Sequence, residues 1–343
     1  MRGSGSMSGT VSRELRRPNG APAPASTGPN FFLIGAARSG TTALAEMLRR
    51  HPDVFVTRPK EPHFLAFAGR EVAFTGPSDE ATVNQAAVTD PAAYLALYRT
   101  VRGEHARGDA AVTSLYYAER SLETLHRRFP DARVVAILRN PVTRAYSAYS
   151  YLRVRGFEPC ADFLDALARE PERIRLGWQH LWHYVAMGRY ARQLEPFFEQ
   201  LGPERVEVTF YEHLCDEPLE IGRRLFDFLG VDAGVELSCE RVNVSGTPRS
   251  RAIQSAIRWG TRRPLLRSAL KTATPFQLRE RVRRTNLAPD ELPEAASRML
   301  HELFVDEVRD LRALLAHYVP GLVESAPGWL AGGEAASRGA LPA

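Results

Sequence analysis

The segment that decides the fold is FFLIGAARSGTTALAEML, residues 31–48. Four apolar residues run into Gly35, and apolar residues then recur at helical spacing from Ala43 to Leu48. This pattern predicts a buried strand, a tight glycine-containing loop and a helix. Because the first N–H groups of such a helix point toward the loop, the unit predicts a site for a phosphate-like anion.

Three further strands follow along the chain, at residues 54–56, 134–138 and 206–210. The strand at 134–138 runs into Asn140 and Pro141, which suit the N-cap and the first position of a helix. Strands that alternate with helices predict an α/β, P-loop-like three-layer fold, in which helices cover both faces of a central parallel sheet. In such sheets ligands bind beyond the carboxyl ends of the strands.

The chain of 343 residues predicts one α/β domain with two flanking segments. Residues 1–29 are expected to form a disordered N-terminal arm that begins with an expression-vector remnant. The domain is expected over residues 30–318, followed by a C-terminal tail over 319–343.

Composition excludes several classes of protein. A net charge of +5 with scattered basic residues argues against a dedicated nucleic-acid binder but allows a site for small polyanions. Three cysteines at wide spacings fit neither a disulfide framework nor a zinc site, and predict a reducing, cytoplasmic location. The sequence contains no long apolar segment, so it predicts no membrane span. The oligomeric state stays open.

The predicted loop differs from that of a nucleotide triphosphatase at one position. Thr41 follows the second glycine, where such a loop has the lysine that grips the terminal phosphates. An ATP or GTP hydrolase is therefore not expected. Arg38 puts a cation inside the loop, which suits a donor that ends in phosphosulfate.

Residues 34–44 resemble the corresponding loop of sulfotransferases that use 3'-phosphoadenosine 5'-phosphosulfate (PAPS), in the branch with bacterial enzymes and heparan sulfate sulfotransferases. The resemblance extends from Phe31 to about Leu315. It implies that PAPS is the co-substrate and that the loop holds its 5'-phosphosulfate. The residues implied at that end of the donor are Arg38, where the family usually has lysine, Ser39, Gly40, Thr41 and Thr42.

Two other segments resemble donor-binding parts of the family. RNPVTRAYS, residues 139–147, is similar to the signature in which Arg139 and Ser147 hold the 3'-phosphate, and an arginine can fork onto phosphate. NVSGTPRSR, residues 243–251, looks like a late loop over the donor, which implies contacts from Gly246 and Arg249. A solvated basic turn is an equally good interpretation of that last segment.

KEPHF, residues 60–64, resembles the segment that carries the general base in the heparan sulfate branch. The resemblance favours Glu61 as the base, whereas histidine is the commoner general base in enzymes, so His63 stays an alternative. In an extended strand, both side chains would face the same side. Lys60 either assists the leaving group or only pairs with Glu61. With Arg38 and the loop amides supplying the charge, we expect catalysis without a metal.

Two rival functions share the predicted sheet and loop. One is an ATP-dependent phosphotransferase, which would need a loop lysine and metal-binding acids that the sequence does not offer. The other is a catalytically inactive nucleotide-binding scaffold. The acceptor is expected to be a small or medium-sized molecule or a glycan. The arginine-rich, lysine-poor composition favours a bacterial natural product.

Overall fold

The computed structural model describes residues 28–235, 247–248, 287–288 and 291–332. Gly246 and Arg249, predicted to contact the donor, lie outside the described residues.

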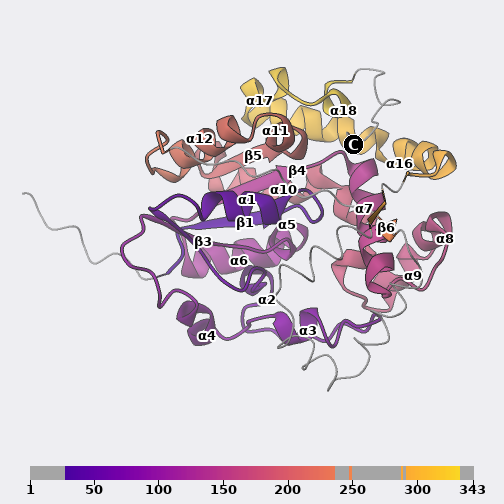
Figure 1. Cartoon of the computed structure of the whole chain (residues 1–343), viewed down its shortest axis with the longest axis horizontal. Coiled ribbons are helices and arrows are strands. Elements are labelled where there is room, and N and C mark those ends of the chain that lie inside the picture. Colours follow the sequence, from indigo (N-terminus) through magenta and orange to yellow (C-terminus); the bar gives the residue numbers. More distant parts are fainter. Residues whose placement is uncertain (1–27, 236–246, 249–286, 289–290, 333–343) are drawn as a thin grey trace, which may run out of the picture.

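A five-stranded parallel sheet forms the centre of the molecule (Figure 1). The order of its strands is β2-β3-β1-β4-β5. Their bounds are Phe31–Gly35 for β1, Val54–Val56 for β2, Ala106–Ala110 for β3, Arg133–Leu138 for β4 and Val206–Phe210 for β5. The predicted α/β fold with a parallel sheet is confirmed.

The sequence analysis missed β3, because Ala-Arg-Gly-Asp-Ala is not an apolar run. All five of its residues are nevertheless buried. Arg107 donates hydrogen bonds to the carbonyl oxygens of Gly28, Glu104 and His105, so its charge is satisfied by backbone. Asp109 accepts a hydrogen bond from the Tyr94 hydroxyl. A polar strand can therefore occupy the interior because the Arg107 guanidinium and one oxygen of the Asp109 carboxyl group have specific partners.

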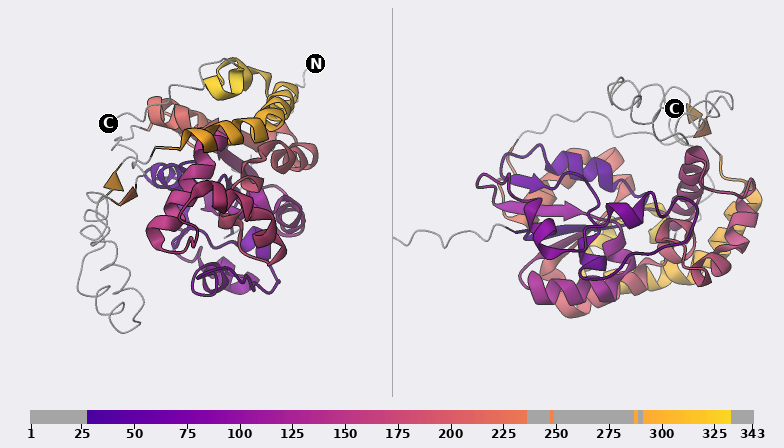
Figure 2. Two further views of the ribbon diagram at one scale, coloured as in Figure 1. Left: turned by 90° about the vertical axis from the view of Figure 1, so that its right-hand side faces the viewer. Right: turned by 90° about the horizontal axis from the view of Figure 1, so that it is seen from below.

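Alternate residues of the strands face two different apolar layers. Phe31 and Leu33 pack against α1 (Thr41–Leu48) and α12 (Pro218–Leu229). Phe32 and Ile34 pack on the other face, against α6 (Ala118–Arg128), α10 (Tyr190–Leu201) and α16 (Glu294–Tyr318). Because both faces are covered, the strands are buried on both sides, as a parallel sheet requires. Figure 2 shows the covering helices from two further directions.

A helical layer extends the sheet beyond β4. Helix α7, Pro141–Arg155, packs against α8, Phe163–Ala168, and against the first half of α16. Helix α9, Glu170–Arg175, contacts α8. The other described helices are α2 Phe64–Phe67, α3 Val83–Ala86, α4 Pro91–Ala96, α5 Thr113–Tyr116, α11 Tyr211–Asp216, α17 Pro320–Glu324 and α18 Gly328–Ala331. Short 3-10 helices cover His180–Trp182, Ala186–Gly188 and Pro203–Arg205. Strands β6 (Thr247–Pro248) and β7 (Leu287–Ala288) form a separate antiparallel pair.

The segment after residue 318, predicted to be a C-terminal tail, begins with α17 and α18. Leu330 on α18 is fully buried in the apolar layer that also contains Leu311 and Leu315 of α16. None of the described helices is long and apolar enough to cross a membrane.

Leu330→Ala should lower the free energy of unfolding by about 2–4 kcal/mol, because a fully buried leucine leaves both a transfer cost and a cavity. Leu303→Ala on α16 is the control, since Leu303 is 37% exposed and its loss should cost well under about 1 kcal/mol. Urea unfolding of the two variants checks this. Equal stabilities would show that the domain ends before α18, where the sequence analysis placed its boundary.

Candidate active site

The predicted phosphate loop joins the carboxyl end of β1 to α1. Arg38 and Gly40 adopt left-handed backbone conformations, with φ of 65° and 90°. A Cβ atom at Gly40 would lie 2.8 Å from the Tyr211 ring, so this turn requires glycine for both its space and its φ. No side chain caps the amino end of α1. Its first N–H groups and the positive end of the helix dipole therefore suit an anion.

The predicted second signature lies directly against this loop. Asn140 caps α7 by accepting a hydrogen bond from the Val142 N–H at 2.9 Å, and Pro141 is the first helical residue, as predicted. Arg139 donates from Nη1 to the Arg38 carbonyl oxygen at 3.2 Å. The Tyr190 hydroxyl donates to the Arg139 carbonyl oxygen at 3.0 Å. These contacts hold Arg139 at the carboxyl end of β4, next to the loop.

Ser147 of α7 also reaches the loop. Arg38 donates from Nε to the Ser147 Oγ at 3.3 Å. The guanidinium of Arg38 lies 4.5 Å above the Tyr151 ring centre, one helical turn further along α7. The fold therefore brings together Arg38, Arg139 and Ser147, although 109 residues separate the first from the last.

Among the remaining loop residues, Ser39 and Thr41 are buried, whereas Gly40 is partly exposed and Thr42 is exposed. Thr41 and Thr42 are the first two residues of α1. Thr41 has a side-chain partner outside the loop, which is Lys60.

Lys60 and Glu61 lie next to the phosphate loop, between the start of α1 and the end of β3. The Glu61 N–H donates to the Ala110 carbonyl oxygen at 3.0 Å, which fixes the segment to the end of β3. The Lys60 Nζ lies 3.2 Å from the Thr41 Oγ1 and 2.6 Å from the Glu61 Oε1. One ammonium thus bonds both the start of α1 and the predicted base.

The backbone of this segment is not the extended strand that the sequence analysis considered. Glu61 and His63 both have positive φ, 66° and 58°, and His63 directly precedes α2. Their side chains still meet, because two left-handed residues fold the segment back toward the sheet edge. The His63 Nε2 lies 4.0 Å from the Glu61 Oε2.

The electrostatic surroundings separate Glu61 from His63. Burial is the largest single effect on Glu61 and opposes its ionisation, but the attraction of Lys60, His63 and His180 and the hydrogen bond from Lys60 together lower the pKa of Glu61 to about 2. Burial lowers the pKa of His63, against the pull of Glu61. The His63 Nδ1 lies 3.1 Å from the Thr113 Oγ1. At neutral pH, Glu61 is therefore a carboxylate, and the buried His63 ring lies between it and Thr113.

The sequence analysis missed a group of aromatic residues beside Glu61 and His63. The His180 ring centre lies 6.2 Å from that of His63 and 6.0 Å from that of Tyr117. Burial, helped by His63, lowers the pKa of His180 to about 3, so its ring is neutral. The signal in the sequence is the density of rings in WQHLWH, residues 178–183.

Buried hydrogen bonds hold this aromatic segment in place. The Asp79 carboxylate accepts from the Gln179 N–H at 2.9 Å and from the Trp182 indole N–H at 3.3 Å. The His183 Nδ1 lies 2.7 Å from the Tyr116 hydroxyl oxygen. The segment is thereby tied both to the 69–90 loop and to α5, which follows β3.

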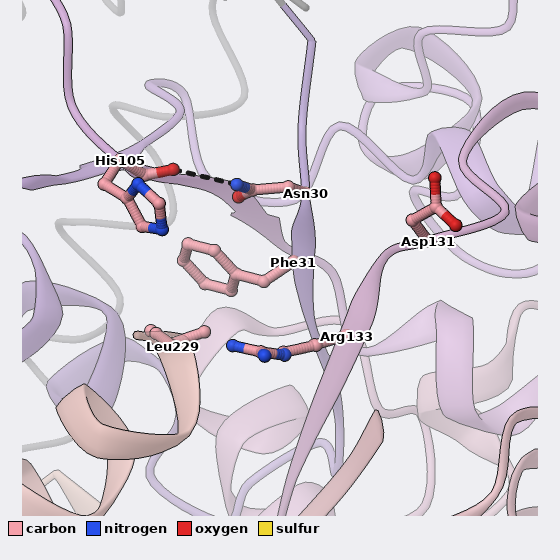
Figure 3. Close-up of a pocket in the computed structure, with 6 residues that line it drawn as sticks. All are labelled: Asn30, Phe31, His105, Asp131, Arg133 and Leu229. Atoms are coloured by element: carbon pink, nitrogen blue, oxygen red, sulfur yellow. Dashed lines mark hydrogen bonds between the residues drawn. The ribbon is translucent and has the colours of Figure 1, made fainter. Parts of the chain in front are cut away.

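A cavity of about 190 Å³ lies elsewhere, at the amino ends of the strands (Figure 3). It is lined by Asn30, Phe31, His105, Asp131, Arg133 and Leu229. Phe31 and Arg133 begin β1 and β4, whereas the loop and Glu61 follow the carboxyl ends. The cavity is therefore separate from the candidate active site.

In the part of the chain that the structure describes, no group of three or more histidine, cysteine, aspartate or glutamate side chains is arranged to hold a metal ion.

Comparison with known proteins decides the family. The sequence profile of the sulfotransferase family matches residues 29–234, which include the loop, Glu61, Arg139 and Ser147. The chain belongs to the sulfotransferase family. A solved sulfotransferase from Alicyclobacillus acidocaldarius is 31% identical to it with a TM-score of 0.65, over 83% of this chain and 95% of the other.

Two curated relatives have names that refer to different roles. Mouse heparan sulfate glucosamine 3-O-sulfotransferase 3B1 is 28% identical over 59% of this chain and 46% of the relative. The nodulation protein NoeE of Sinorhizobium fredii is 30% identical over 60% of this chain and 52% of the relative. The chain thus spans about half the length of these two relatives.

Asp109 gives a test of the electrostatics beneath Lys60. Burial raises the pKa of Asp109 to about 7, although the Tyr94 hydrogen bond and Lys60 both oppose the shift. The folded chain then binds a proton that the unfolded chain releases near pH 3.8, so stability must fall as pH rises from about 4 to about 7.

Asp109→Asn should remove this pH dependence, because asparagine does not ionise. Relative to the variant, the wild type should lose unfolding free energy between pH 5 and pH 8, measured by urea unfolding at both values. Asp131→Asn, at an exposed aspartate, is the control and should behave like wild type. Parallel curves for wild type and Asp109→Asn would show that Asp109 is ionised throughout.

Proposed function

We propose that this sulfotransferase moves a sulfuryl group from PAPS to a hydroxyl of a small or medium-sized acceptor. The observation that carries the proposal is the position of Glu61. A carboxylate at the mouth of a phosphate loop, fixed to the end of β3 and bonded to a lysine that also touches α1, suits proton removal beside a bound anion.

The described residues support a defined placement of PAPS. Its 5'-phosphosulfate would lie over the amino end of α1, within reach of Ser39, Gly40, Thr41 and Thr42. Its 3'-phosphate would lie at Arg139 and Ser147, where an arginine fork and a hydroxyl suit a dianion. The two ends of the donor then bridge the carboxyl ends of β1 and β4.

The reaction that this placement favours is in-line displacement at sulfur. The acceptor hydroxyl oxygen bonds to sulfur while the bond from sulfur to the bridging oxygen breaks. The hydroxyl proton passes to Glu61, and adenosine 3',5'-bisphosphate leaves with the negative charge of the bridging oxygen. Cations and amide N–H groups at that oxygen lower the barrier, because they are already in place as the charge develops. We propose that no metal takes part.

The surroundings of the two candidate bases favour Glu61. Its side chain is partly exposed, so an arriving hydroxyl can reach it. His63 is buried and close to Thr113, which suits a positioning residue that orients Glu61.

Several aromatic side chains flank the base and favour an acceptor with a flat face. Tyr116 and Tyr117 lie against His180 and are partly exposed, and both sugars and phenols pack against such rings. Because relatives are named for heparan sulfate and for nodulation, both a glycan and a small molecule remain in the proposal. We favour a small bacterial product made in the cytoplasm.

Adenosine 3',5'-bisphosphate should bind to the protein in calorimetry, and ATP with magnesium should bind far more weakly. Arg139→Ala should weaken binding of the bisphosphate by about 1.5–3 kcal/mol, the range for a charge-assisted hydrogen bond, and Ser147→Ala should cost less. Arg70→Ala, which removes an arginine paired with Glu123, is the control. Tight binding of ATP would favour the phosphotransferase, and unchanged affinity in Arg139→Ala would refute the 3'-phosphate site.

Glu61→Gln should lower turnover by roughly 10²–10⁴-fold while affinity for the bisphosphate holds, because the amide cannot accept the proton. His63→Ala should lose less. Glu46→Gln is a matched control at a partly exposed carboxylate on α1. An inactive His63→Ala beside a near-normal Glu61→Gln would make His63 the base. Bisphosphate binding without turnover with any acceptor in a labelled-donor screen would favour the inactive scaffold.

A further inference from the structure

Arg38 lies in the phosphate loop and Lys60 lies beside it. Their charged groups face different ends of the proposed donor site. The sequence analysis gave Arg38 the part next to the transferred group, because it occupies the family's lysine position. Its guanidinium instead points at α7, where Nε donates to Ser147 and the plane covers Tyr151. The guanidinium of Arg155 lies 4.6 Å from the centre of the same Tyr151 ring, so two positive charges lie against this part of α7.

Lys60 has the opposite orientation. Its ammonium contacts Thr41, the first residue of α1, and its side chain is only 16% exposed. Thr41 itself occupies the place where a triphosphatase loop has its lysine. A lysine from the segment after β2 therefore brings a point charge to the loop position that lacks one.

We propose that Lys60 is the cation on the transferred phosphosulfate and that Arg38 belongs to the 3'-phosphate site with Arg139 and Ser147. This assignment rests on the proposed function and divides the roles of the two cations within it. It also separates two kinds of recognition. A planar guanidinium suits the terminal 3'-phosphate, where two oxygens can accept in parallel, and a compact ammonium suits a single bridging oxygen.

The double contact of Lys60 gives it a specific part in the displacement. In the ground state its charge is balanced by Glu61, 2.6 Å away. As the acceptor proton reaches Glu61, that carboxylate becomes neutral, while negative charge appears on the bridging oxygen. The ammonium can then turn from Glu61 to the leaving phosphate, so its interaction is stronger in the transition state than before it.

The test compares Lys60→Met and Arg38→Met, with Arg58→Met as a control. Arg58 is an exposed cation two residues before Lys60 that pairs with Glu46. Calorimetry measures affinity for adenosine 3',5'-bisphosphate and for AMP, which lacks the 3'-phosphate. Turnover is followed as release of the bisphosphate from PAPS, with water as acceptor if no better one is known. Lys60→Gln and Arg38→Gln replace any methionine variant that fails to fold.

Arg38→Met should lose roughly 10–100-fold in affinity for the bisphosphate and almost none for AMP, as expected for a charged hydrogen bond to the 3'-phosphate. Lys60→Met should change the affinity for the bisphosphate and the affinity for AMP by the same factor. It should lower turnover by about 10²–10³-fold. Arg58→Met should match wild type.

Equal losses for both nucleotides in Arg38→Met, together with normal turnover in Lys60→Met, would overturn the division of roles. Failure of the proposed function itself looks different. In that case the wild type would not prefer the bisphosphate over AMP and would not cleave PAPS.

Discussion

The site depends on the parallel register of three neighbouring strands. Because β3, β1 and β4 run the same way, the residues that follow them leave the sheet at one edge. Glu61 is bonded to the last residue of β3, the phosphate loop follows β1, and Arg139 follows β4. Segments more than 70 residues apart in sequence therefore lie together at this edge of the sheet. The edge holds an uncapped helix start, three cations and one carboxylate within a few contacts of one another.

Several elements that form this edge of the sheet can be predicted from the sequence. Particular residues show why the other elements cannot. An apolar run before a glycine loop identifies β1, and Asn140 with Pro141 marks the start of α7. The sequence analysis missed strand β3 because it contains Arg107 and Asp109, which are buried where backbone carbonyls and the Tyr94 hydroxyl form hydrogen bonds with them. Such partners arise from tertiary contacts that no local pattern contains.

The directions of the side chains in the candidate site also could not be predicted from the sequence. The motif places Arg38 inside the loop, but its left-handed backbone and the Tyr151 ring turn the guanidinium toward Ser147. Likewise, Glu61 and His63 meet through two residues of positive φ and not through an extended strand. The sequence motifs named Arg38, Glu61 and His63 as candidates, whereas the contacts between their side chains depend on backbone conformations that are rare for residues other than glycine.

The central claim is that this edge of the sheet binds PAPS in one orientation. A crystal structure with adenosine 3',5'-bisphosphate measures it directly. The account predicts the 5'-phosphate over the amino end of α1 near Lys60, and the 3'-phosphate between Arg38, Arg139 and Ser147. A nucleotide bound in the reverse orientation, or in the cavity at the amino ends of the strands, would contradict it.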